Sequence, residues 1–287
     1  VLPLTFIFLW ASAFSTGSVV TQDATPFAAL AFRFLLVTIG FLIIILVLGE
    51  KLRYVKGLHH CLITGLLFHG MYLGGIFYSV SVGTPAAISA LIVCLQPIFT
   101  ALLAGCLLNE HINFRHWSGL VLGLAGTALV LGLDTEELMS TAGLVANIVA
   151  LIGITVGTIW QKRFSNEIPL ATNNGIQALT ACVFHCILMW LFESPKIEFT
   201  FRFSIAMTWQ VIAISFGAFS ILMYLINRHS TIQIASLFYL VPPVAAVISL
   251  ILLDEVLTPL DIIGFLVASF GVYLATRTNE VPVELSK

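Results

Sequence analysis

The stretch Ala90-Leu-Ile-Val-Cys-Leu-Gln-Pro97 has a counterpart 145 residues later, Ala235-Ser-Leu-Phe-Tyr-Leu-Val-Pro242. Both are apolar runs that reach a proline about midway through a longer apolar stretch. The same offset superimposes three more pairs in order: Glu110 on Glu255, Gly119 on Gly264 and Gly126 on Gly271. Matches that keep order and spacing indicate an internal repeat. We therefore predict two repeats, at residues 1–133 and 134–287.

The composition identifies the class of protein. Of the 287 residues, 59% are apolar and 9% are charged, and the mean hydropathy is +1.06. A soluble domain carries roughly 25% charged residues, so this chain cannot cover itself with a water-compatible surface. Its charged residues fall in short segments between long apolar runs, which predicts an integral membrane protein.

Ten apolar runs are long enough to cross a bilayer, because a spanning helix needs roughly 20 apolar residues and must satisfy its own backbone hydrogen bonds. We expect an all-α protein with transmembrane helices near 4–22, 27–48, 60–80, 86–107, 117–133, 142–160, 172–192, 207–226, 232–253 and 260–276. Five spans per repeat is an odd number, so the second repeat enters the membrane inverted. Secondary transporters commonly use such inverted repeats.

The positive charges predict the orientation, because short cytoplasmic loops are enriched in Lys and Arg. With the N-terminus inside, nine basic residues are cytoplasmic: Lys51, Arg53, Lys56, Arg115, Lys162, Arg163, Arg228, Arg277 and Lys287. Two, Lys196 and Arg202, are external, and Arg33 lies within a span. Both termini are then cytoplasmic.

Several functional classes find no support in the sequence. A net charge of -2 without a basic stripe argues against nucleic acid as a partner. The five cysteines lack zinc-type spacing, so no metal is expected, and we expect no cleavable signal peptide. The sequence also lacks the serine-hydrolase, zinc-protease and phosphate-loop motifs, so neither an enzyme nor a cofactor is indicated.

The paired stretches carry a family resemblance. Residues Ser89 to Pro97 through Asn109-Glu110, and Ala235 to Pro243 through Asp254-Glu255, resemble the signature of the EamA family in the drug/metabolite transporter superfamily. Leu9-Trp10-Ala11, Pro26 and Arg33 also match that pattern. The resemblance implies ten helices in a bacterial inner membrane, a central cavity between the halves, and export of amino acids, other metabolites or drugs.

Polar and aromatic residues within the apolar runs are candidates for the cavity wall. They are Trp10, Arg33, His69, Tyr72, Tyr78, Gln96, Asn147, Trp160, Tyr224, Asn227, Ser236 and Tyr239. Arg33 is the most informative, because an arginine inside a membrane is costly unless it is paired. It either snorkels outward, pairs with Asp23, or contacts an anionic cargo. His69 and His185 either hydrogen-bond a neighbouring helix or take part in proton relay or cargo contact.

The prolines and two glutamates are candidates for moving parts. Pro97, Pro242 and Pro243 each remove a backbone hydrogen bond, so they form either packing kinks or hinges beside the cavity. Glu110 and Glu255 end their apolar runs at opposite membrane faces. They are either solvated carboxylates or gate-side ion pairs, Glu110 with Arg115.

These observations predict a secondary transporter for small polar metabolites or drugs, working by alternating access at a midplane cavity. Its partners are the lipid bilayer, the small-molecule cargo and, as a candidate coupling ion, the proton. A passive facilitator or channel of the same architecture remains an alternative, as does a membrane-embedded enzyme that relies on His69 and His185.

Overall fold

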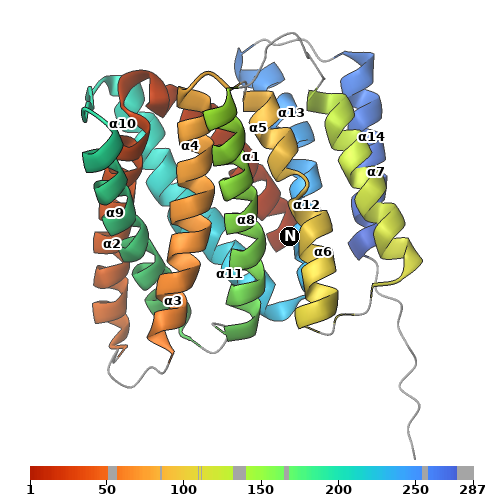
Figure 1. Ribbon diagram of the computed structural model, residues 1–287, viewed down its shortest axis with the longest axis horizontal. Coiled ribbons are helices and arrows are strands. Elements are labelled where there is room, and N and C mark those ends of the chain that lie inside the picture. The colour runs from red at the N-terminus through yellow and green to blue at the C-terminus, as the bar shows by residue number, and fades with distance from the viewer. Residues whose placement is uncertain are drawn as a thin grey trace, which may run out of the picture.

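The computed structural model describes residues 1–50, 57–84, 86–108, 110, 112–131, 140–164, 168–253 and 258–276. This part of the chain is helical, apart from one isolated antiparallel bridge between Ala24 and Ile197. The helices run up and down through the molecule (Figure 1), and seven are long and apolar enough to cross a membrane. The all-α membrane class is thus confirmed, while the count of ten spans stays a prediction.

The seven long helices are α1 (Leu2–Asp23), α2 (Pro26–Leu48), Leu58–Ser81, α8 (Thr141–Phe164), α9 (Leu170–Phe192), Phe201–Arg228 and α14 (Pro259–Thr276). The other three predicted spans contain α5 (Ala86–Val93), α6 (Gln96–Leu107), α7 (Phe114–Leu131), α12 (Thr231–Leu237) and α13 (Val241–Leu253). In Figure 1, α1 and α9 end at the upper end of the molecule, where α2 and α10 begin. At the lower end, α6 and α11 end and α12 begins.

Two of the long helices change to a π-helix in the middle. Leu58–Ser81 consists of α3 (Leu58–Gly65), the π-helical η2 (Leu66–Leu73) and α4 (Gly74–Ser81). Phe201–Arg228 consists of α10 (Phe201–Trp209), the π-helical η3 (Gln210–Ala218) and α11 (Phe219–Arg228). The two π-helices occupy matching positions at the 145-residue offset. Such wider turns are rare and are frequent at functional sites.

The two proline-containing helices are interrupted at equivalent places. α5 and α6 are separated by Cys94 and Leu95, and the turn η4 (Phe238–Leu240) separates α12 from α13. Each break comes just before a proline, Pro97 or Pro242, which has no N–H with which to continue the preceding helix.

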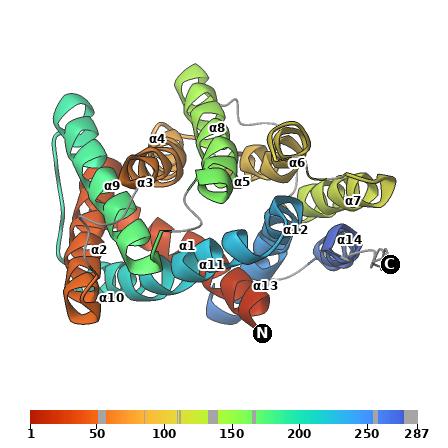
Figure 2. The same cartoon turned by 90° about the horizontal axis from the view of Figure 1, so that it is seen from below.

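Two helix pairs pack closely at opposite sides of the bundle, α2 with α9 and α7 with α14 (Figure 2). Between α7 and α14 the backbones touch: a Cβ on Gly119 would lie 2.6 Å from the Gly271 carbonyl oxygen, and one on Gly264 would lie 2.7 Å from that of Gly126. Small residues permit this approach, which supplies the van der Waals packing that holds helices together in lipid.

The α2–α9 pair is joined at both ends. The Glu193 carboxylate, at the end of α9, accepts hydrogen bonds from the backbone N–H groups of Phe27 (2.8 Å) and Ala28 (3.1 Å) at the start of α2. At the other end, the Glu50 carboxylate accepts a hydrogen bond from the Thr172 hydroxyl near the start of α9. The Glu193 carboxylate thus lies where the N-terminus of α2 presents unpaired N–H groups and a favourable dipole.

Candidate functional site

A cavity of about 170 Å³ lies inside the bundle. Its walls come from α1, α2, α4, α5, α11, α13, η4 and both π-helices, and therefore from both halves of the chain. Its polar lining consists of Trp10, Ser18, Thr21, Arg33, His69, Tyr72, Ser89, Gln210 and Ser215. The rest of the lining is largely apolar: Ala13, Phe68, Leu73, Ile76, Phe77, Val80, Val93, Ile214, Phe219, Phe238, Val241 and Pro242 among others.

Arg33 on α2 is the charged side chain in this wall, and it is 6% exposed. Its Nε donates a hydrogen bond to the Ser215 hydroxyl on η3 (3.0 Å), and Ser215 donates to the backbone oxygen of Gln210 (3.1 Å). Two of the expectations for Arg33 do not match this geometry. The side chain does not snorkel outward, and Asp23 instead accepts from Thr200 (2.6 Å) and lies 3.5 Å from Arg202.

His69 on η2 lies beside Arg33's helix, with its ring between Phe34 (4.8 Å between centroids) and Phe219 (4.2 Å). Its backbone oxygen accepts a hydrogen bond from Nε2 of His185 at 3.0 Å. Because a carbonyl can only accept, His185 carries its proton on Nε2. His185 is fully buried and serves to join α9 to the π-helix, whereas His69 faces the cavity.

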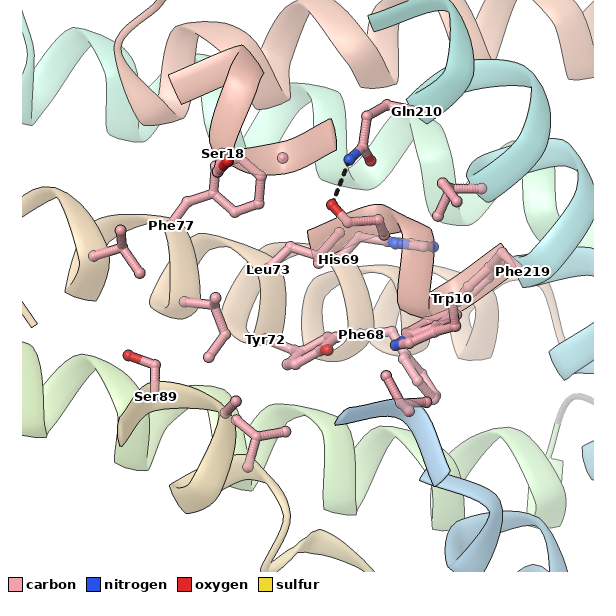
Figure 3. Close-up of a pocket in the computed structure, with 18 of the residues that line it drawn as sticks. Trp10, Ser18, Phe68, His69, Tyr72, Leu73, Phe77, Ser89, Gln210 and Phe219 are labelled. Atoms are coloured by element: carbon pink, nitrogen blue, oxygen red, sulfur yellow. Dashed lines mark hydrogen bonds between the residues drawn. The ribbon is translucent and has the colours of Figure 1, made fainter. Parts of the chain in front are cut away.

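An aromatic cluster lies toward the lower side of the cavity. This aromatic floor consists of Trp10, Phe68, Phe219 and Phe238, which line the cavity, and of Phe6, which packs on Trp10. The ring centroids of Phe6 and Trp10 are 5.3 Å apart, those of Trp10 and Phe238 5.5 Å, and those of Phe68 and Phe219 5.6 Å. Figure 3 shows Trp10, Phe68 and Phe219 at one side of the cavity, and Ser18 and Phe77 at the other. Tyr72 turns its hydroxyl toward the Trp10 indole.

Hydrogen bonds hold the helix ends together below the floor. The Glu110 carboxylate accepts from the backbone N–H of Thr231 at 2.8 Å, at the start of α12. Lys162 donates to the backbone oxygens of Ile226 and His229, each at 2.8 Å. Arg163 donates to the Leu107 carbonyl at 2.8 Å. These contacts join α6, α8, α11 and α12. Glu110 thus contacts a helix N-terminus, and Glu255 lies outside the described residues.

Toward the upper end the cavity lining is different. Ser18 and Thr21 of α1, Val80 of α4 and Ser89 of α5 border it, and all four lie close to the ends of their helices. Among the described lining residues on this side, Phe77 is the one aromatic ring. The cavity therefore extends from the aromatic floor toward the upper end of the molecule.

Trp10, Arg33, His69, Tyr72 and Pro242 are the sequence candidates that line the cavity. Other candidates are buried nearby. Gln96 donates to the Thr100 hydroxyl at 2.8 Å, and Asn147 donates to Ser79 at 2.7 Å and to the lining residue Ser89 at 3.2 Å. Ser236 donates to the Gln233 carbonyl of its own helix at 2.9 Å. The Tyr239 ring packs on Gly123.

The remaining candidates lie away from the cavity. Trp160 contacts His60 (5.7 Å between centroids) and Phe164 (4.6 Å) at the lower end. Tyr224 is 43% exposed, with the Arg228 guanidinium over its ring. Tyr78 stacks on Phe27 at 5.9 Å. Asn227 is half-buried near the end of α11, while Pro97 and Pro243 are buried without lining the cavity.

Sequence reasoning missed Gln210 and Ser215. Both lie in the apolar run 207–226 and stand out there as polar residues, so the signal that selected Gln96 could have selected them. Gln210 donates to the Ala13 carbonyl (2.9 Å) and to the Thr16 hydroxyl (2.8 Å), which attaches η3 to α1. No sequence pattern predicted the π-helix that carries both residues.

The sequence model of the EamA-like transporter family matches residues 1–132 and 141–277 of this chain. The chain belongs to the EamA-like transporter family. The resemblance noted from the paired proline stretches is therefore confirmed, and so is the two-repeat architecture that the family implies.

Several curated relatives are similar to this EamA family chain, two of them over nearly their whole length and one over about two thirds of it. An uncharacterised transporter of Synechocystis is 26% identical, with 97% of this chain and 89% of the relative covered. A protein of Escherichia coli named a probable amino-acid metabolite efflux pump is 24% identical, with 96% and 93% covered. A probable terminal-alkyne amino-acid exporter of Streptantibioticus cattleyicolor is 25% identical, with 68% and 66% covered.

A solved crystal structure shares the fold of the EamA family chain. Its TM-score is 0.82 at 19% sequence identity, and the match covers 96% of each chain. At this level of identity the likeness concerns the fold alone.

Proposed function

We propose that this protein is a secondary transporter that exports small polar metabolites, amino acids or similar compounds, by alternating access at the cavity. Membership of a transporter family supports the general activity. The names of two relatives, an amino-acid metabolite efflux pump and an amino-acid exporter, support the cargo class and the direction. The observation that carries the proposal is the cavity itself, because residues of both halves of the chain line it.

The proposed topology has ten spans in two inverted repeats, 1–133 and 134–287, with both termini in the cytoplasm of a bacterial cell. The glycine contacts support the inversion, because exchanging the halves converts the Gly119–Gly271 contact into the Gly264–Gly126 contact. Lys162, Arg163 and Arg228 at the lower end agree with a cytoplasmic location, and Lys196 and Arg202 at the upper end with an external one.

In this topology the aromatic floor faces the cytoplasm and the cavity extends outward. The structure then corresponds to an outward-facing state, in which Glu110, Lys162 and Arg163 hold the inner ends of the helices together. The inward-facing state requires those contacts to separate and the outer ends of α1, α4 and α5 to approach. The breaks before Pro97 and Pro242 offer places where the two parts of each helix can move separately.

The orientation can be tested by labelling single cysteines from each side of right-side-out vesicles. A cysteine at Glu198 should react with a membrane-impermeant reagent added outside, and a cysteine at Arg163 should not. Labelling of position 163 from outside would overturn the topology.

Transport itself is tested in proteoliposomes with a panel of labelled amino acids, organic acids and lipophilic cations. We expect uptake of at least one small polar metabolite, accelerated when unlabelled cargo is present on the opposite side. A proton gradient should drive its accumulation if the proton is the coupling ion. A passive facilitator, the second candidate, would equilibrate the cargo without accumulation under any imposed gradient. Movement of lipophilic cations alone would contradict the proposed cargo.

A further inference from the structure

The cavity contains a fixed positive charge without a negative counterpart. Among the described residues that line it, Arg33 is the one permanently charged side chain, and none is Asp or Glu. The described residues form two ion pairs, Lys196 with Glu198 and Arg202 with Asp23, and neither involves Arg33. Arg33 has a hydroxyl, that of Ser215, as its hydrogen-bond partner.

Arg33 is therefore a buried cation without an anionic partner among the described residues. Burying a guanidinium away from water is costly. A neutral hydroxyl and the face of the Phe34 ring, 5.5 Å from the Arg33 guanidinium carbon, compensate for part of that cost without supplying a negative charge. The Ser215 contact occupies Nε, and the two terminal nitrogens have no hydrogen-bond partner in the described part of the chain. A guanidinium presents its N–H groups as a planar fork that matches the two oxygens of a carboxylate. The free edge of Arg33 therefore has the geometry of a carboxylate-binding group.

The surroundings of Arg33 indicate what the carboxylate is attached to. Phe68, Phe77, Phe219 and Phe238 dominate the remainder of the wall, with several aliphatic side chains. A cavity of about 150 Å³ lined by apolar side chains holds one benzene ring, which is close to the 170 Å³ found here. The lining offers no carboxylate for an ammonium group.

We propose that the cargo is a small carboxylate with one apolar body of about the size of an aromatic ring. Its carboxylate is held by Arg33, and its body rests on the aromatic floor. This inference rests on the proposed transport function and narrows its cargo. An amino group on the cargo is tolerated but not required, so the recognised element is the anion and not the zwitterion.

A charge series of four probes tests this on the purified wild-type protein by titration calorimetry. The probes are 3-phenylpropanoate, phenylalanine, phenethylamine and acetate. We expect both aromatic carboxylates to bind, and phenethylamine, which lacks the carboxylate, to bind at least tenfold more weakly. Acetate, which lacks the apolar body, should also bind at least tenfold more weakly. Equal affinity for phenethylamine and 3-phenylpropanoate would overturn the proposal, as would the absence of binding by both aromatic carboxylates.

The residue is tested with Arg33→Gln and the matched control Arg202→Gln, which removes an exposed arginine at the upper end. We expect Arg33→Gln to weaken the binding of 3-phenylpropanoate at least tenfold. The ratio of its affinity to that of phenethylamine should also fall, while Arg202→Gln should change neither the affinity nor the ratio. Undiminished binding by a folded Arg33→Gln would refute the assignment. If Arg33→Gln does not fold, Arg33→Lys keeps the charge but loses the fork, and we expect several-fold weaker binding.

The transport panel separates this inference from the proposed function. If the protein transported amines or neutral metabolites and the rate did not depend on Arg33, the transport function would be supported and the carboxylate site refuted. If carboxylates bound in an Arg33-dependent way but no compound were transported, the transport function would be refuted and the binding site supported.

Discussion

Position 33 on α2 is an arginine in the first half of the chain, and 145 residues later the position on α9 is Ala178. In the same way His69 on η2 corresponds to Ile214 on η3, and Ser215 corresponds to Gly70. Yet both halves share the proline breaks, the π-helices and the glycine contacts of α7 and α14. The two repeats thus agree where helices pack and differ where side chains face the cavity.

That difference has a physical origin. Packing contacts between two related repeats must fit each other, so a change in one half requires a matching change in the other. Gly119 and Gly264, for example, correspond at the 145-residue offset, and a Cβ on either would lie within 2.7 Å of a carbonyl oxygen of the opposite helix. The cargo that we propose has no such symmetry, since its charged and apolar ends differ. A cavity that binds it must place Arg33 on one side only.

Moving the buried positive charge from position 33 to position 178 should give the largest change in stability. We expect Arg33→Ala to fold with an unchanged or higher thermal midpoint, because it removes a buried unpaired cation. Ala178→Arg should lower the free energy of unfolding by about 3 kcal/mol or more, since Ala178 is 2% exposed and does not line the cavity. Thermal unfolding in detergent measures both variants. Ala178→Leu controls for size, and an equal loss there would show that charge is not the cause.

Enlarging a glycine at the α7–α14 crossing should reduce stability equally in the two halves. Gly126→Leu and Gly271→Leu each push a side chain into the backbone of the opposite helix, as a Cβ alone would lie 2.5 Å from the Gly264 oxygen and 2.7 Å from the Gly119 oxygen. We expect each to cost about 1–3 kcal/mol. The yield and midpoint of Val121→Leu, a change on the exposed face of α7, should match wild type. Unequal losses for the two glycines would argue against a symmetric crossing.

Replacing the prolines should change the transport rate more than the thermal stability. Pro97→Ala and Pro242→Ala let each helix continue across its break, and we expect transport to slow about tenfold while the thermal midpoint changes little. Pro242 lines the cavity and Pro97 does not, so Pro242→Ala should also alter cargo affinity. Pro259→Ala, at the first residue of α14, is the control, because proline there interrupts no helix. A double variant with the wild-type transport rate would show that the prolines are packing features.

The carboxylates at the ends of α2 and α9 should give the smallest effects. Glu193 accepts from two backbone N–H groups of α2, whereas Glu50 accepts from a hydroxyl. We therefore expect Glu193→Gln to cost about 1 kcal/mol and Glu50→Gln clearly less, measured as chemical or thermal unfolding. Glu198→Gln, on an exposed residue, should be neutral. A larger loss for Glu50→Gln would mean that the hydroxyl contact matters more than the helix N-terminus.

The local elements were predictable because they follow from short-range chemistry. The apolar runs predicted several of the long helices to within a few residues, as with 27–48 against Pro26–Leu48. The prolines predicted the breaks at Pro97 and Pro242, since a missing N–H acts wherever the residue lies. The π-helices were not predictable, because His69 and Gln210 occur in runs that read as ordinary apolar helix.

By itself, the sequence determined the membrane class, the repeat and the family, because hydropathy, spacing and motif are properties of the chain. The tertiary structure decided which way each helix faces. In lipid both the outer surface and the packed interior are apolar, so hydropathy does not distinguish them: Leu46 is 71% exposed while Phe34, on the same helix, is 1% exposed. Only the packing of the helices turned Arg33, His69 and Tyr72 toward one cavity, and Tyr224 and Trp160 away from it.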